Sequence, residues 1–317
     1  MGRVAVTLAA IFLSATAAAA QESPQQESPQ QTERKATSNN EIEVLVPRRL
    51  EKKELAGEIS NLYEWRLFQE TVPRYFEPLC PRVTGVEDKV ARMVETRLRA
   101  VADYVGLDEA DADCSPNAFV IVLDEPAKMF DRLVAKRPGL LGDYRTRDLH
   151  VRAIRGALKA GKPLVAWNQI DVRNIDGPMI QDIDGPPTLR TPSSSRLRTA
   201  GFQAKSVSVV VFDKKQLADV EAVQMADIAA LHLLASPRRY ADLDTVTTPT
   251  MLTLFRKGHR KSPREMTDFD RAYLKGIYAM RENDWSSRVN RSVLAAYQAQ
   301  CIEEGVPCPQ GPVPAGK

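Results

Sequence analysis

The chain has 317 residues, a formal net charge of +3 at pH 7 and 27% charged residues. Acidic and basic side chains are interspersed, so there is no basic stripe of the kind that nucleic-acid binding needs. The composition therefore argues against nucleic acid and membrane surfaces as partners, and by itself it indicates no reaction.

The first 20 residues have the pattern of a secretory signal peptide. Arg3 gives a positive start, residues 4–13 are largely apolar, and Ala18 and Ala20 suit the small-residue cleavage rule. The apolar stretch is shorter than the roughly 20 residues that span a bilayer. We therefore expect a periplasmic or secreted protein that begins at Gln21 and has no transmembrane segment after cleavage.

Composition divides the rest of the chain into three parts. Residues 21–40 repeat Gln, Glu, Ser and Pro and lack the apolar side chains that ordering requires, so they are expected to be a disordered spacer. Residues 41–303 show no internal repeat or clear linker and are expected to form one domain. Residues 304–317 are rich in Pro and Gly and are expected to be a flexible tail.

Apolar periodicity predicts the elements of the domain in chain order. Residues 87–105 carry apolar side chains at spacings of three and four, which is typical of an amphipathic helix, and residues 205–213 form a continuous β-branched run. A long loop is expected at 173–201, and a short apolar segment at 249–255. The predicted strands are 41–46, 118–123, 163–172 and 205–213, and the predicted helices are 51–70, 87–105, 126–135, 146–160, 216–236, 267–280 and 286–303. This pattern predicts an α+β fold with a small mixed or antiparallel sheet packed with several helices.

Four cysteines in an exported chain favour disulfides. Cys80 and Cys114 flank one predicted helix, whereas Cys301 and Cys308 lie at and after the last one. Local pairing, Cys80 with Cys114 and Cys301 with Cys308, is the simplest of the three possible schemes. Zinc binding is the alternative, but zinc sites usually bring cysteines in close pairs such as C-x-x-C, which this chain lacks.

Three polar residues stand out as candidate binding residues near the C-terminal half. Gln224 and Asp227 interrupt the apolar face of the 216–236 helix, where an unpaired polar group would cost roughly 1–3 kcal/mol, so both must have partners. Asp270 stands three residues after Thr267, as in a capping box. For all three, a structural hydrogen bond or a helix cap is the alternative to a ligand-binding role.

Trp167 and Asn168 are the candidate binding residues on the 163–172 strand. An exposed strand with these side chains could stack on and hydrogen-bond to an extended peptide. The alternative is a core tryptophan beside polar residues at a sheet edge.

Three pieces in the last third of the chain carry a resemblance. They are the helical segment 224–234, the apolar segment 250–255, and the segment from Met266-Thr267-Asp268-Phe269-Asp270 through Tyr278. Their order resembles an uncharacterised family of exported bacterial proteins with a zincin-like, metalloprotease-like C-terminal half, which implies a zincin-like fold over 205–283. This chain departs from that family's H-E-x-x-H or H-E-x-x-Q motif, since Gln224-Met225 replaces the zinc-binding His and catalytic Glu, and Ile228 stands at the second ligand position.

The leading functional hypothesis is a non-catalytic exported protein, in which a degenerate zincin-like domain binds a peptide or a cell-envelope component in a groove between the 163–172 strand and the 216–236 helix. No catalytic residue, metal ligand or cofactor is assigned. His150, His232 and His259 are scattered along the chain. A metal-dependent hydrolase with unconventional ligands and a structural envelope protein are the two alternatives.

Overall fold

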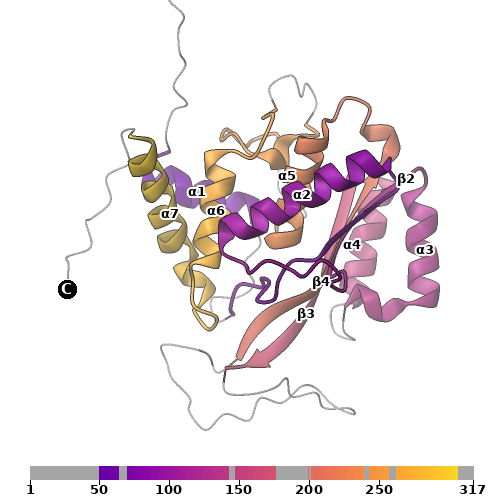
Figure 1. Ribbon diagram of the computed structural model, residues 1–317, viewed down its shortest axis with the longest axis horizontal. Helices are drawn as coiled ribbons and strands as arrows, with labels where there is room; N and C mark the ends of the chain where they lie inside the picture. Colours follow the sequence, from indigo (N-terminus) through magenta and orange to yellow (C-terminus); the bar gives the residue numbers. More distant parts are fainter. Residues whose placement is uncertain are drawn as a thin grey trace, which may run out of the picture. The chain divides into compact units, whose positions relative to one another are not determined.

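A four-stranded mixed sheet organises the fold (Figure 1). The structure is a computed structural model that describes residues 50–63, 70–142, 147–175, 199, 201–238, 243–256 and 262–305. In these residues the strands are β1 (Pro81–Thr84), β2 (Ala118–Leu123), β3 (Leu164–Asn174) and β4 (Gly201–Asp213). They lie in the order β1-β2-β4-β3, with β1, β2 and β4 parallel and β3 antiparallel to β4. The predicted α+β class is confirmed, and the sheet is mixed.

Helices cover both faces of this sheet (Figure 1). One face carries α2 (Asp88–Val105) and α5 (Ala222–Leu234), and the other carries α3 (Pro126–Lys136) and α4 (Arg147–Lys159). Successive side chains of a strand point to opposite faces. Val210 and Phe212 of β4 therefore join the core under α2 and α5, whereas Val209 and Val211 join the core under α3 and α4.

The remaining helices extend the larger core beside α2 and α5. They are α1 (Lys52–Leu62), α6 (Asp268–Tyr278) and α7 (Val289–Glu304), and short 3-10 turns occupy Pro138–Leu141, Lys214–Gln216, Met251–Thr253 and Ser286–Arg288. The predicted capping box is present at the start of α6, between Thr267 and Asp270. All described residues belong to one compact unit, Arg48–Lys317.

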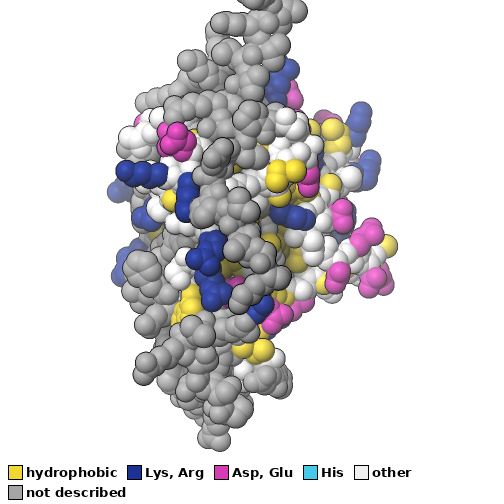
Figure 2. All heavy atoms as spheres, turned by 90° about the vertical axis from the view of Figure 1, so that its left-hand side faces the viewer, with side chains coloured by type: hydrophobic (Ala, Val, Ile, Leu, Met, Phe, Trp, Pro, Cys, Tyr) yellow, Lys and Arg dark blue, Asp and Glu magenta, His cyan; other side chains and the backbone are white. Residues whose placement is uncertain are grey.

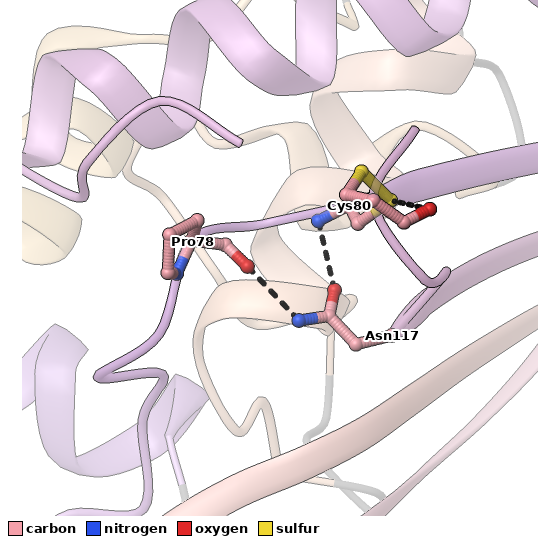
Figure 3. Close-up of a disulfide and its surroundings, with 4 residues drawn as sticks. Pro78, Cys80 and Asn117 are labelled. Carbon is pink, nitrogen blue, oxygen red and sulfur yellow. Dashed lines mark hydrogen bonds between the residues drawn. A yellow bond between two sulfur atoms is a disulfide. The ribbon is translucent and has the colours of Figure 1, made fainter. Parts of the chain in front are cut away.

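The predicted disulfide between Cys80 and Cys114 is present. It fastens the start of β1 to the segment that leads into β2. Asn117 reinforces this join, because its Oδ1 accepts a hydrogen bond from the Cys80 amide at 2.9 Å and its Nδ2 donates to the Pro78 carbonyl at 3.0 Å (Figure 3). Cys301 is buried in α7, and its predicted partner lies outside the described residues.

The structure corrects several predicted boundaries. The 216–236 helix begins only at Ala222, because Glu221 forms a capping box with Gln224 and the preceding residues are turns. The 51–70 helix ends at Leu62, and β4 starts four residues earlier than predicted. Strand β1 was not predicted, since it has only four residues and begins with a proline. The predicted strand 41–46 and most of the 173–201 loop lie outside the described residues.

Figure 2 shows Lys and Arg side chains as well as Asp and Glu side chains among the described residues of one face. None of the described helices combines the length and the apolar character needed to cross a bilayer.

Candidate functional site

A cavity of about 1110 Å³ lies between β3 and α5 and continues around the edge of β3 to α4. These are the strand and the helix between which the sequence analysis expects a groove. β3 lines it with Leu164, Val165, Ala166, Asn168 and Ile170, and α5 contributes Ile228 and His232. The cavity therefore follows the outer edge of the sheet for several residues.

The register of the sheet shows which backbone groups of β3 face this cavity. The Ser208 amide donates to Asn117 at 2.9 Å, so Ser208 faces β2, and its partner Asn168 must face away from β4. The Asp213 amide donates to the Pro163 carbonyl at 2.9 Å, which fixes the same alternation from the other end. The N–H and C=O groups of residues 164, 166 and 168 thus point outward, and no described residue hydrogen-bonds to them.

The opposite edge of the sheet is closed. β1 has four residues, and the Val83 amide donates to Glu95 Oε1 of α2 at 2.9 Å. A short edge strand with its amide occupied is one of the ways in which proteins block further strand pairing. β3 is the longer edge, and it opens onto the cavity.

Asn168 adds an unsatisfied polar atom to this edge. Its Oδ1 is buried and has no hydrogen-bond partner among the described residues, although Asn168 lines the cavity. A buried acceptor without a donor costs roughly 1–3 kcal/mol. A ligand that donated a hydrogen bond to Oδ1 would recover that free energy.

The side chains that line the cavity differ between the two sides of the β3 edge. On the α5 side the wall is apolar and formed by Ile228, Leu252, Leu254 and Phe255. On the α4 side it is formed by His150 and by small residues, and a methyl group added at Gly156 would meet no atom within 4 Å. Side chains on either side of an extended ligand would therefore find an apolar surface or free space.

His232 lines the cavity from α5, and Lys205 of β4 acts on its charge state from within the fold. Burial lowers the pKa of Lys205 well below its usual value, and its Nζ donates to the Leu233 carbonyl at 2.8 Å and to the Ala235 carbonyl. Burial, and then the charge of Lys205, lowers the pKa of His232 to about 4. His232 is therefore a neutral polar group in the cavity lining at neutral pH, able to donate or accept a hydrogen bond.

Trp167 is a core residue and does not line the cavity. It is 3% exposed, packs edge to face with Phe130, and donates from Nε1 to the Leu140 carbonyl at 3.0 Å. Its side chain points toward α3 and α4, on the face opposite to Leu164 and Ala166. Of the two strand candidates, only Asn168 reaches the cavity.

Gln224 and Asp227 are both used inside the fold. Gln224 accepts from the Glu221 amide at 3.1 Å and donates to the Pro263 carbonyl at 2.9 Å. Asp227 is 0% exposed and accepts two hydrogen bonds from Arg97 of α2, at 2.8 and 3.0 Å, and one from the Met266 amide at 2.5 Å. The partners that the sequence analysis required are present, and neither residue lines the cavity.

Asp270 joins α6 to the turn that precedes it. Its carboxylate accepts from Thr250 Oγ1 at 2.5 Å, from the Met251 amide at 2.9 Å and from Thr267 Oγ1 at 2.9 Å. Burial raises the pKa of Asp270 to about 6 although these hydrogen bonds favour the charged form. The five candidates therefore do not form one site.

The structure brings His150 of α4 and His232 of α5 into the lining of the same cavity. His150 Nδ1 lies 2.9 Å from the Leu141 carbonyl. Among the described residues, which do not include His259, no group of three or more His, Cys, Asp or Glu side chains is arranged to hold a metal ion.

Sequence reasoning missed Leu164, Ala166 and His232 as cavity residues. The alternating pattern of the strand was visible, but which strand lies at a sheet edge depends on pairing with residues about 40 positions later. His232 was set aside because it lies away from the Asp227 face of the helix. The Asp227 face of α5 packs against α2, whereas His232 lines the cavity from another face of the helix.

Comparisons with protein-family models, with curated proteins and with solved structures find no match for this chain. The zincin-like resemblance of residues 205–283 therefore stays a hypothesis. The site is interpreted from its own geometry.

Proposed function

We propose that this protein is an exported, non-catalytic binding protein that takes an extended peptide segment along the edge of β3. The observation that carries the proposal is the row of outward N–H and C=O groups at residues 164, 166 and 168, which opens onto a cavity of about 1110 Å³. A peptide strand added to a sheet edge gains affinity from main-chain hydrogen bonds and specificity from pockets for its alternate side chains.

The open edge of β3 is long enough to pair with a short peptide segment. Residues 164 to 168 span roughly 14 Å of extended chain, which pairs with about five ligand residues. The apolar wall beside Ile228 favours an apolar side chain on one face of that segment, and Asn168 Oδ1 favours a donor. Charged residues of both signs also line the cavity, in nearly equal numbers, so they give no preference for a strongly charged ligand. They are Glu70, Lys162, Lys215, Asp219, Arg238, Asp244 and Arg256.

Two further observations support the remaining parts of the proposal. The Cys80–Cys114 disulfide suits an oxidising compartment, in agreement with the predicted signal peptide. In the zincin-like resemblance the second metal-ligand position falls on Ile228, and Ile228 lines the cavity. A substrate groove that remained after the second metal ligand was replaced accounts for the position of Ile228 in the lining.

The test uses a library of labelled decapeptides in which apolar and polar residues alternate, measured by fluorescence anisotropy. Ala166→Pro removes an outward N–H without removing a hydrogen bond to β4, and proline is tolerated at such edge positions. We expect it to weaken binding about tenfold, the effect of losing one hydrogen bond worth roughly 1.4 kcal/mol. Ala166→Val keeps the N–H and is the matched control, with binding within about twofold of wild type.

Thermal unfolding of Ala166→Pro establishes that the variant is folded before its affinity is interpreted. Mass spectrometry of the recovered peptides tests the non-catalytic part, since we expect them intact. Equal binding by all three proteins, or no binding by any library member, would contradict the proposal. Cleaved peptides would instead favour the hydrolase alternative.

A further inference from the structure

A second cavity, of about 440 Å³, contains a buried arginine that the peptide groove does not use. Arg74 is 3% exposed, and its Nη2 donates to the Met280 carbonyl at 2.6 Å. Its guanidinium carbon lies 4.7 Å from the centre of the Phe76 ring. Nη1 is buried and has no hydrogen-bond partner among the described residues.

The charge of Arg74 has no direct counter-ion in the described part of the chain. No described carboxylate forms an ion pair with its nitrogen atoms. Glu282 and Asp284 act on its charge from a greater distance, and Asp284 is already bonded to Arg288 at 2.9 Å and to the Arg281 amide at 3.1 Å. Burial lowers the pKa of Arg74, but a guanidinium remains protonated in proteins. A buried charge without a direct ion-pair partner is unfavourable, and Nη1 also lacks an acceptor, so the site favours an incoming anion.

The surroundings of Arg74 can hold a small oxyanion. The cavity is also lined by Tyr278, Arg281, Glu282 and Asn283. Arg281 and Glu282 are exposed at the rim, so their long side chains can be displaced when a ligand enters. Arg281 supplies a second positive charge, whereas Glu282 opposes an anion and limits its affinity.

We propose that this cavity binds an oxyanion, a phosphate or carboxylate group, through Nη1 of Arg74 and the side chain of Arg281. A guanidinium offers several N–H donors in a fixed plane and matches both groups, which is why arginine is preferred at such sites. The proposal concerns a different cavity from the peptide groove and does not depend on it.

The experiment measures thermal unfolding of the mature protein with increasing inorganic phosphate or acetate, at constant pH and constant ionic strength set by sodium chloride. A ligand that binds the folded state raises the melting temperature in a saturable way. We expect saturation with phosphate or with both anions. A response to phosphate alone assigns the site to phosphate groups, and a response to both assigns it to oxyanions generally.

Two variants locate the effect. Arg74→Met should raise the apparent dissociation constant at least tenfold. Arg281→Gln should raise it about threefold. Because Arg281 is exposed, this second variant is expected to fold even if Arg74→Met does not. Arg92→Gln, an exposed arginine of α2, is the matched control and should leave it unchanged. A response that is not saturable, or is equal in Arg281→Gln and wild type, would overturn the proposal.

Discussion

Asp270 is a buried carboxylate whose ionisation the fold must tolerate. Burial raises its pKa from 3.8 to about 6. Between pH 4 and 6 the folded protein therefore holds a proton on Asp270 that the unfolded chain has lost. By linkage, raising the pH through this window lowers the free energy of unfolding, by on the order of 2–3 kcal/mol for this group.

Urea unfolding of wild type and Asp270→Asn at several pH values tests this. The asparagine loses some hydrogen bonds at every pH, but it does not titrate. We expect the stability of wild type relative to the variant to fall between pH 4 and 6 and to be constant above. A difference that does not change with pH would show that Asp270 keeps an ordinary pKa.

Single polar residues also mark the limit of sequence reasoning. The apolar face of the 216–236 segment showed that Asp227 needed a partner, but not that the partner is Arg97, which lies 130 residues earlier. The capping role of Asp270 was visible because its cap lies within four residues. Local hydrogen bonds can be predicted from spacing, whereas long-range ones require the fold.

At the scale of elements, the contact between α6 and α7 depends on one glycine. A Cβ built at Gly276 would lie 2.5 Å from the Val293 Cα, closer than any real contact, so α7 would have to move. We expect Gly276→Ala to lower the free energy of unfolding by roughly 1–3 kcal/mol, as overpacking does.

Gly57 of α1 is the matched control for this change. A Cβ there meets nothing within 4 Å, and alanine is the better helix former. Gly57→Ala should therefore stabilise by roughly 0.5–1 kcal/mol in the same urea experiment. If both variants changed the free energy of unfolding in the same direction, helix propensity, and not the α6–α7 contact, would determine the effect of Gly276→Ala.

The disulfide makes a second prediction at this scale. It joins positions separated by 34 residues, and constraining a loop of that length in the unfolded chain is worth roughly 3–4 kcal/mol. We expect the double variant Cys80→Ala and Cys114→Ala to unfold at correspondingly lower urea concentration. Adding reductant to that variant separates the two predicted disulfides, because any further loss of stability would report the second predicted pair, Cys301 with Cys308.

Helices and buried strands were predictable where apolar spacing was regular. α2, β2 and α6 match their predicted segments closely, because each buries a face that the sequence marks with apolar residues. β1 was missed, since four residues give too little pattern. Its place in the sheet depends on pairing with β2.

At the scale of the whole molecule, the two edges of the sheet are predicted to behave differently. The amide of Val83 on β1 is bonded to Glu95, whereas the amides of residues 164, 166 and 168 on β3 have no described partner. In the free protein, these three amides should exchange with solvent faster than those of residues 165 and 167, which pair with β4.

A bound peptide strand should slow the exchange of these three β3 amides and leave the β1 amides unchanged. Residue-resolved hydrogen exchange, with and without a saturating decapeptide from the binding library, should show new protection at residues 164, 166 and 168 and none at Val83. In Ala166→Pro, both peptide binding and the new protection of the residue 168 amide should be lost, because neighbouring hydrogen bonds of an added strand form together. Protection of α5 and Ile228 without protection of the three β3 amides would mean that the ligand fills the apolar wall and does not extend the sheet.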